Sequence, residues 1–450
     1  MQGGIKMAYE YDVAFIGSGQ GAWNGAIPMA QAGLKVAVIE RGLWGGVCTN
    51  RGCNAKFTLD RPVALLTQIK QLQGRGFDSV PQINWPDLMA HKHEVIGPLS
   101  DSNRQKLINA GVKTIVGCAT FVDAHTLQVN HHTLTADKIV IVSGQRPKRL
   151  DIPGQQYMHD STDFLSATPL PHRLVILGAG FVGMEAASIA KAAGADVTLI
   201  VDSTKALKQF YQPAVKQLIS QMQSDGIKFI FGQETTAVEK TATGYRLLGA
   251  NQFVQDADYI LDATGRTPNI EKLNLPVTKV TTDAHGIIVN DHLQTAEPNI
   301  YATGDVVSKR IPKITPTAIF ESQYLAQLFT QQTTAAIQYP AIGVNVFTMP
   351  RLAQVGISPD VAKQELNKYR VEHYCYADDW YHQVQNETSG GLTVVFNRQD
   401  QLVGAVDLSN EAPNTINTFI DYIQMGITAK QLHNFVYIFP SLQHSTMRKM

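Results

Sequence analysis

The chain has 450 residues, of which 44% are apolar and only 17% are charged. A chain of this length exceeds what one hydrophobic core supports, so several domains are expected, and the low charged fraction indicates surface buried in an oligomer. Lys plus Arg and Asp plus Glu balance at 38 each, which excludes a strongly basic nucleic-acid or membrane binder and leaves small molecules as the expected partners.

The amino-terminal region shows no export signal. No run of 18 apolar residues lacks Gly or charged interruptions, and no signal-peptide pattern precedes the first strand. We therefore predict a cytoplasmic protein. Residues 1–6 are interpreted as a dispensable leader, because Met7 would serve equally well as a start. Four cysteines are too few for a secreted disulfide framework in a chain of this size.

The first predicted element is a strand at residues 11–16, followed by Gly17-x-Gly19-x-x-Ala22 and an alanine-rich helix. In such a loop the first glycine permits a tight turn, the second lets a pyrophosphate approach the helix amino terminus, and the third position must be small. The next strand ends at Glu40, 23 residues after Gly17, where a carboxylate can bind a ribose diol. The glycine motif alone also fits an ordinary tight turn, but this combination completes a dinucleotide-binding fingerprint.

Two cysteines, Cys48 and Cys53, follow within residues 45–56 and are separated by four residues. One helical turn brings sulfurs at this spacing into bonding range, so the pair predicts redox chemistry. The alternatives are two unpaired core cysteines and a structural zinc site, which favours Cys-x-x-Cys spacing and four ligands. Because the positive end of a helix favours thiolates, the pKa of these thiols is expected to be lowered. Cys118 and Cys375 are expected to pack in the interior.

A second copy of the pattern begins with a strand at residues 173–177 and continues with Gly178-x-Gly180-x-x-Gly183. It predicts a second nucleotide-binding fold, whose glycines have the same three roles.

The residues after the next strand of this fold bear on the nicotinamide nucleotide. Asp202 would bind the ribose 2′-hydroxyl of NADH and repel a 2′-phosphate, whereas Lys205 and Lys208 would attract the 2′-phosphate of NADPH. The sequence slightly favours NADH and leaves both open.

The carboxyl-terminal residues 335–450 contain no further glycine-rich loop. Strand patterns at residues 345–348, 392–396 and 402–406 alternate with helices, which is typical of an α+β interface domain. Domain boundaries are predicted at residues 147–153, near Pro268 and around residue 335.

Four further motifs follow in order: Val142-Ser143-Gly144, Ala263-Thr-Gly265-Arg266-Thr-Pro-Asn269, Tyr301-Ala-Thr-Gly304-Asp305 and Thr315-Pro-Thr317-Ala318. Together with the two glycine loops and the cysteine segment, they give the chain a strong resemblance to the pyridine nucleotide-disulfide oxidoreductases, which include lipoamide dehydrogenase, glutathione reductase and mercuric reductase. The resemblance covers nearly the whole chain. It implies FAD and NADH or NADPH as cofactors and a twofold homodimer.

The resemblance also implies a glutathione-reductase-like α/β fold with two Rossmann-like dinucleotide-binding domains and a carboxyl-terminal α+β dimerisation domain. The FAD domain would have two segments, 7–150 and 271–334. The NAD(P)H domain would be residues 151–270, and the interface domain residues 335–450.

Catalytic roles also follow from the resemblance. Cys53 would lie against the flavin and Cys48 would attack the acceptor, while Lys56 would pair with Glu185 where hydride arrives. The alternative for Lys56 is a solvated side chain.

Cofactor contacts are implied in the same way. Glu40 would bind the adenosine ribose and Asp305 the FAD ribityl chain, although Asp305 could instead cap a helix. Gly117 and Ala119 lie where the family contacts adenine. The other implied cofactor-binding residues are Gly17, Gly19, Ala22, Arg41, Gly46, Val47, Cys48, Lys56, Ser143, Gly144, Gly178, Gly180, Gly183, Asp202, Gly265, Arg266, Gly304, Thr317 and Ala318.

The chain departs from the family near its carboxyl terminus, where a His before Pro, supplied by the other subunit, normally shuttles the proton of the interchange thiol. Phe439 occupies the His position and His444 the position of the accompanying Glu. General acid catalysis, worth about 10²–10⁴-fold, is missing unless His433, His444 or Tyr437 provides it.

A second departure lies beside the cysteines. The segment between Cys53 and Lys56 is one residue short, which puts the pairing of Lys56 with Glu185 in question. Arg51 could attract an anionic acceptor or be simply solvated.

Three functions fit these patterns. The first is an NAD(P)H-dependent reductase of a small disulfide or related sulfur compound, with Cys48 as nucleophile. The second is a flavin- and dithiol-dependent reductase of a metal ion, quinone or oxygen, which the missing His favours. The third is a redox sensor without catalysis. Cys48→Ala abolishes the first activity, need not abolish the second, and in the third affects only switching.

Overall fold

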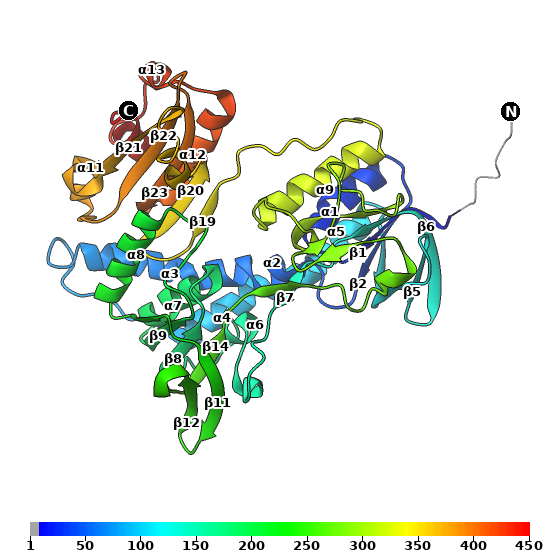
Figure 1. The fold of residues 1–450 in the computed structure, drawn as a ribbon, viewed down its shortest axis with the longest axis horizontal. Helices are drawn as coiled ribbons and strands as arrows, with labels where there is room; N and C mark the ends of the chain where they lie inside the picture. The colour runs from blue at the N-terminus through cyan, green and yellow to red at the C-terminus, as the bar shows by residue number, and fades with distance from the viewer. Residues whose placement is uncertain (1–8) are drawn as a thin grey trace. The chain divides into compact units, whose positions relative to one another are not determined.

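The computed structural model describes residues 9–450 (Figure 1), so the interpreted leader at residues 1–6 lies outside the described residues. The described chain divides into two units. The first contains residues 9–56, 91–148 and 266–338, and the second contains residues 57–90, 149–265 and 339–450. In the described part, no helix is long and apolar enough to cross a membrane.

The first unit is built on β1 (Tyr11–Ile16), whose residues 13–16 are buried. Val13 and Phe15 enter one hydrophobic cluster and Ala14 and Ile16 another, as expected for a central strand covered on both faces. The sheet order is β3-β2-β1-β6-β5-β4, and β18 also pairs with β6. The other strands are β2 (Val36–Glu40), β3 (Lys113–Val116), β4 (Ala119–Phe121), β5 (Thr126–Val129), β6 (His132–Ile141) and β18 (Ile300–Ala302).

Strands β1, β2, β3, β6 and β18 are parallel, whereas β4 and β5 continue from β6 as an antiparallel pair of hairpins. Parallel β1 and β2 are joined through a helix, so the predicted strand–loop–helix–strand reading of this segment is confirmed.

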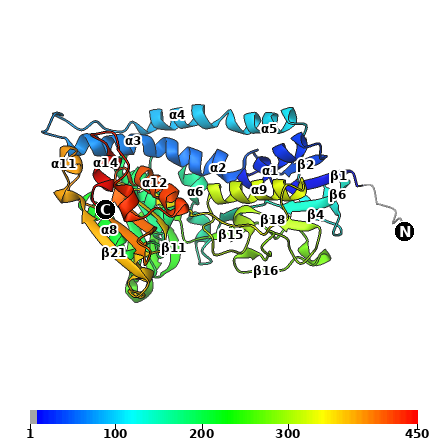
Figure 2. The same cartoon turned by 90° about the horizontal axis from the view of Figure 1, so that it is seen from above.

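Two helices of the first unit, α1 (Gln20–Gln31) and α9 (Thr315–Phe329), lie side by side (Figure 2). The contact requires glycine at position 25, because a Cβ there would lie 2.6 Å from the carbonyl oxygen of Ser322. Thus α1, which begins at the first glycine loop, is packed directly against α9.

The remaining elements that begin in or belong to this unit are α2 (Gly46–Arg51), α3 (Cys53–Gln71), α5 (Leu99–Asn109), β7 (Gln145–Pro147), β15 (Arg266–Pro268), β16 (Thr282–Asp283), β17 (Gly286–Ile287) and the short 3₁₀ helices η3 (Leu275–Val277) and η4 (Gly304–Val306).

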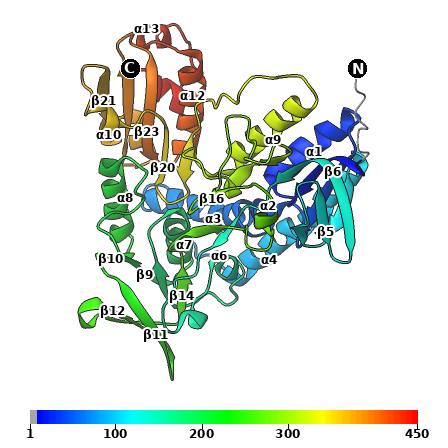
Figure 3. The ribbon, with the colours of Figure 1, turned by 45° about the vertical axis from the view of Figure 1, so that its right-hand side comes forward.

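The second unit contains the second parallel sheet, with strand order β10-β9-β8-β14 (Figure 3). Strand β8 (Arg173–Leu177) coincides with the prediction, and β9 (Asp196–Val201) begins one residue earlier than predicted. The other elements of this part are α4 (Trp85–Ile96), η1 (Gln155–Tyr157), α6 (Ser161–Phe164), α7 (Phe181–Ala192), α8 (Gln212–Ser224), β10 (Lys228–Phe231), β11 (Thr235–Thr241), β12 (Gly244–Gly249), η2 (Ala250–Gln252), β13 (Val254–Ala257) and β14 (Tyr259–Asp262), of which α4 continues into the first unit.

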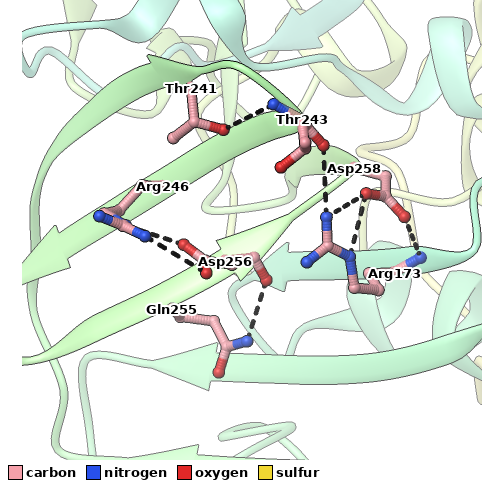
Figure 4. A network of polar contacts seen from close by, with 7 residues as sticks. All are labelled: Arg173, Thr241, Thr243, Arg246, Gln255, Asp256 and Asp258. Atoms are coloured by element: carbon pink, nitrogen blue, oxygen red, sulfur yellow. Dashed lines mark hydrogen bonds and ion pairs between the residues drawn. The ribbon is translucent and has the colours of Figure 1, made fainter.

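An antiparallel meander, β11-β12-β13, adjoins the parallel sheet. Figure 4 shows two ion pairs there: Arg173 of β8 pairs with Asp258, directly after β13, and Arg246 pairs with Asp256 within the meander. The backbone N–H and Nε of Arg173 donate to Asp258 at 2.9 and 3.0 Å. Within the meander, Nε of Arg246 donates to Asp256 at 2.8 Å. Because these side chains are partly exposed and solvent screens their charges, the two ion pairs add little to stability.

The carboxyl-terminal part of the second unit is an antiparallel sheet of order β19-β20-β23-β22-β21, covered by α12 (Ala412–Met425). The three predicted strands are confirmed as β19, β22 and β23, with shifted ends. Elements here are β19 (Val344–Val346), β20 (Arg351–Gly356), α10 (Pro359–Ala362), β21 (Tyr369–Cys375), η5 (Tyr376–Asp378), α11 (Trp380–Val384), β22 (Gly391–Asn397), β23 (Leu402–Ser409), α13 (Ala429–Leu432) and α14 (Leu442–Met447).

One prediction about packing is wrong. Cys118 and Cys375 are both exposed, not interior residues. Cys118 lies immediately before the edge strand β4, and Cys375 is the last residue of the edge strand β21, so each has a neighbouring strand on one side only.

Candidate active site

The first glycine loop is shaped to hold a diphosphate. Gly17 has φ +108°, and a Cβ there would lie 2.4 Å from the carbonyl oxygen of Val142, so only glycine fits. Gly19 precedes α1 without a side-chain cap, which leaves the first backbone N–H groups of the helix available to an anion. A Cβ at Gly46 would lie 2.8 Å from Cα of Gly19, so the cysteine segment rests on this loop. Ala22 is fully buried beneath it.

Glu40 lies at the end of β2, beside this loop. Its Oε2 accepts hydrogen bonds from the backbone N–H and hydroxyl of Ser18 at 3.0 and 2.7 Å, and its Oε1 accepts from Gly42 at 2.8 Å. A carboxylate offers about four acceptor sites, so Glu40 is held in place with capacity left for a ribose hydroxyl. Arg41 is exposed next to it.

The predicted adenine strand lies next to Glu40. The backbone N–H of Gly117 donates to the carbonyl of Glu40 at 2.9 Å, and Ala119 begins β4. A Cβ at Gly117 would lie 2.5 Å from Cγ1 of Val129, so this strand is also restricted to small residues where it passes Glu40.

The cysteines lie on two helices that meet at Gly52. Cys48 is the third residue of α2 and Cys53 the first of α3. Both are thiols in this structure; Cys48 is half-buried and Cys53 exposed. Sγ of Cys53 lies 3.5 Å from Oγ1 of Thr315, the first residue of α9. The structure therefore brings the pair together with the amino-terminal end of α9.

The ionisation of the pair differs from the prediction. A hydrogen bond to Cys53, and then burial, raise the pKa of the Cys48 thiol far above its ordinary value. The predicted lowering of the pKa is therefore wrong for Cys48. Because one thiolate can accept the proton of its neighbour, the arrangement favours a Cys48 thiol that donates to Cys53.

A second group of polar residues surrounds Asp305, which follows Gly304 in η4. Burial raises the pKa of the Asp305 carboxyl, an effect that Arg266, Lys309 and Lys313 oppose. The residues of the implied flavin site thus concentrate three cations around one buried carboxyl.

Two buried hydroxyls, Oγ of Ser143 and Oγ1 of Thr317, have no hydrogen-bond partner within the described residues. Unpartnered buried hydroxyls are costly unless a ligand satisfies them. Together with the glycine cradle and Glu40, they fit a bound flavin nucleotide, with Gly144, Val47 and Ala318 in the same unit.

The second glycine loop also admits only glycine at two of its positions. A Cβ at Gly178 would lie 2.7 Å from the carbonyl oxygen of Ala263, and one at Gly183 would lie 2.1 Å from that of Gly178. Gly180 has no neighbour within 4 Å of such a Cβ, so its space is open toward a ligand. Asp202 is exposed directly after β9, and its role in binding the ribose stays a prediction.

The remaining predicted residues fall in separate units. Oε1 of Glu185, on α7, accepts from the backbone N–H of Phe347 at 2.9 Å. Lys56 belongs to the first unit, so its pairing with Glu185 stays a prediction. The guanidinium of Arg266 donates to the carbonyl of Gln145 at 2.8 Å, while Gly265 is exposed in the second unit.

At the carboxyl terminus, Phe439 is 64% exposed. Its ring stacks on that of Trp380, with centroids 5.9 Å apart, and meets the edge of the His444 ring at 5.0 Å. These rings border a cavity of about 200 Å³. Burial and a hydrogen bond with Tyr422 raise the pKa of Tyr437, so the lowered pKa that Tyr437 would need as a proton donor does not occur.

The comparisons with known proteins bear on these arrangements. Residues 11–322 match the profile described as pyridine nucleotide-disulphide oxidoreductase, and residues 342–449 match the dimerisation domain of the same family. The chain belongs to this family. Its members bind FAD and NAD(P)H and act as flavin-dependent disulfide oxidoreductases.

Similar proteins come from several branches of the family. A glutathione reductase of Nostoc sp. is 31% identical over 97% of this chain and 98% of its own length. A mercuric reductase of Staphylococcus aureus is also 31% identical, over 94% of this chain and 79% of its own. The solved structure of RclA from Escherichia coli, an HOCl-induced flavoprotein disulfide reductase, matches with a TM-score of 0.89 at 22% identity, covering 98% and 99% of the two chains. The last comparison shows the fold alone.

Two residues near the candidate site, Thr315 and Glu321, were not singled out as site residues from the sequence. Thr315 was noted only as part of a motif, although a Thr-Pro helix start places its hydroxyl beside Cys53. Glu321 was not singled out, although a lone acidic residue among the small and apolar residues of α9 is a signal for a buried charge.

Proposed function

We propose that this chain is an FAD-dependent NAD(P)H oxidoreductase that passes electrons to the Cys48–Cys53 pair and on to a small disulfide or related sulfur acceptor. The observation that supports it most strongly is the contact of Cys48 and Cys53 with each other and with Thr315 in the unit that holds the first glycine loop. We also propose a cytoplasmic homodimer with FAD segments at 7–150 and 271–334, an NAD(P)H domain at 151–270 and an interface domain at 335–450.

Different residues of the chain would hold the cofactor and carry the thiol proton. FAD, when bound, supplies two-electron exchange between the nicotinamide and the dithiol. Glu40, Asp305 and the buried hydroxyls of Ser143 and Thr317 would hold it. In the reduced pair the raised pKa of Cys48 keeps the proton on that thiol, which is hydrogen-bonded to Cys53. Attack by Cys48 on a disulfide then requires transfer of its proton to Cys53 or to another base, because the thiolate is the nucleophile.

A reductase of a metal ion, quinone or oxygen is the second candidate. Phe439 favours it, because phenylalanine cannot protonate a leaving thiol and Tyr437 retains its proton. In that function the dithiol would store electrons without undergoing exchange with a substrate disulfide.

The preference between NADH and NADPH follows from Asp202. Its exposed carboxylate would accept from a ribose hydroxyl and repel a 2′-phosphate, so NADH is the proposed donor, with Lys205 and Lys208 as exposed competitors.

An anaerobic titration of the holoprotein with NADH and, separately, NADPH tests the proposal. The wild-type protein is expected to take up two electrons with a long-wavelength thiolate-to-flavin band. Cys48→Ser leaves Cys53 without its disulfide partner and should show this band before any reductant, whereas Cys53→Ser should never show it.

Cys375→Ser is the matched control, since Cys375 is exposed and belongs neither to the pair nor to the residues proposed to bind FAD. It should behave as wild type. If Cys48→Ser takes up electrons and reduces a disulfide acceptor as the wild type does, the dithiol relay is wrong and direct flavin chemistry replaces it.

A further inference from the structure

Glu321 is a buried carboxylate on α9 that connects separate parts of the first unit. Its side chain is 0% exposed. Oε2 accepts from the backbone N–H of Gly304 at 2.7 Å, and Oε1 lies 2.5 Å from Nζ of Lys309, whose side chain is 8% exposed. Burying two charges costs several kcal/mol for each ion, and a well-packed apolar pair often stabilises a protein as much. Stability alone therefore does not account for this pair.

The turn that Glu321 holds is the one that carries Asp305. Gly304 has φ +75°, a backbone conformation that favours glycine. Oγ1 of Thr303 donates to the carbonyl of Gly21 at 3.0 Å, which ties the turn to α1 directly after the first glycine loop. Nζ of Lys313 donates to the carbonyl of Asp305 at 3.0 Å. The anchors fix the backbone on both sides of the Asp305 carboxyl.

We propose that Glu321 is a positioning residue for FAD. By accepting from Gly304 while Lys309 holds its other oxygen, it fixes the Gly304–Asp305 turn so that the Asp305 carboxyl faces the ribityl chain. The inference rests on the proposed role of Asp305 and adds a residue that does not touch the cofactor.

Paired substitutions separate this role from simple packing. Lys309→Met with Glu321→Gln removes both charges but keeps an acceptor for Gly304, whereas Lys309→Met with Glu321→Leu also removes the acceptor. Neither leaves an unpaired buried charge. The matched control is Lys368→Met with Glu365→Gln, which removes an exposed pair in the second unit with a separation of 2.9 Å.

The measurement is the rate of FAD release from diluted, oxidised holoprotein, followed by the fluorescence of free flavin, together with the flavin midpoint potential and the Tm. The Leu double variant should release FAD at least tenfold faster and shift the midpoint potential, as expected for loss of one well-made hydrogen bond. The Gln double variant and the control should stay within about twofold of wild type.

Equal release from the two double variants, whether fast or slow, overturns the proposal. If the Leu double variant loses FAD during purification, the release rate of the Glu321→Asp variant replaces it in the comparison. This variant keeps the charge, but its shorter side chain cannot span Gly304 and Lys309. Faster release from Glu321→Asp than from the Gln double variant supports positioning, and equal release contradicts it. The release measurement uses oxidised holoprotein without a reductant or an acceptor, so failure of the dithiol relay, seen with Cys48→Ser, does not affect the release rates.

Discussion

At the scale of single residues, Phe439 stands where the resemblance to the family leads us to expect a histidine. Its ring is packed between Trp380 and His444. No group at this position can transfer a proton, while the raised pKa of Cys48 increases the need for one. We therefore expect proton transfer, not cofactor binding, to limit the proposed disulfide turnover.

Replacing Phe439 by histidine tests whether the missing general acid limits disulfide turnover. Phe439→His should raise the turnover of a small disulfide at least tenfold, with a new titration near pH 6.5, because general acid catalysis contributes about 10²–10⁴-fold. Steady-state rates against pH measure it, with Phe435→His, an exposed change in the same segment, as the control. An unchanged rate would show that proton transfer at position 439 does not limit the enzyme.

At the scale of elements, the sequence predicts best where backbone geometry admits one residue type. The loops at Gly17 and Gly178 and their strands were identified because a Cβ would collide with backbone oxygens there. The sequence did not predict that Cys118 and Cys375 are exposed, nor that the pKa of Cys48 is raised. Both outcomes depend on contacts between residues distant in sequence: the place of a strand at the edge of its sheet and the hydrogen bond between the two sulfurs. A sequence motif reflects constraints on the local backbone, whereas the burial of a side chain depends on the contacts of the folded chain.

The second glycine loop offers a comparison of two of its glycines. Gly183→Ala forces its Cβ to within 2.1 Å of the Gly178 carbonyl, so it should cost about 1–3 kcal/mol of stability. Gly180→Ala meets no protein atom and should leave the Tm unchanged, while it raises the KM for NADH because a methyl group faces the pyrophosphate. Thermal melts and NADH kinetics distinguish them; equal Tm values would show that the helix shifts freely.

The carboxyl-terminal sheet contains a buried acid that links its stability to pH. Burial, above all, raises the pKa of Asp407 to about 6, although Tyr376 donates to it at 3.1 Å. A folded-state pKa above the unfolded one gives stability that is present at low pH and is lost as pH rises toward 6 and beyond.

Relative to Asp407→Asn, the wild type should therefore lose about 3 kcal/mol between pH 4 and pH 7, at roughly 1.4 kcal/mol per pKa unit. Chemical denaturation of both proteins across this range measures the difference. A constant difference would mean that Asp407 is ionised in the folded protein at pH 4.

At the scale of the whole molecule, the family's dimerisation domain ends in an exposed apolar segment. Val436 is 99% and Ile438 82% exposed, which is costly for a monomer in water. Val436→Lys with Ile438→Lys should halve the mass measured by light scattering, because lysines desolvated in an interface lack partners. Val254→Lys, an exposed change on the meander strand β13, should leave the mass unchanged. A dimer that survives the double change would place the interface elsewhere.

The exposed Cys118 and Cys375 can serve as internal standards when the redox state of the Cys48–Cys53 pair is measured by alkylation. A bulky alkylating reagent should modify both at similar rates whether the protein is oxidised or reduced, because neither belongs to the Cys48–Cys53 pair. Intact-mass spectra would then show two adducts on the resting disulfide form and a third and fourth after NADH. The fraction of chains that carry the extra adducts would measure, molecule by molecule, how much of a cellular pool is poised to donate electrons.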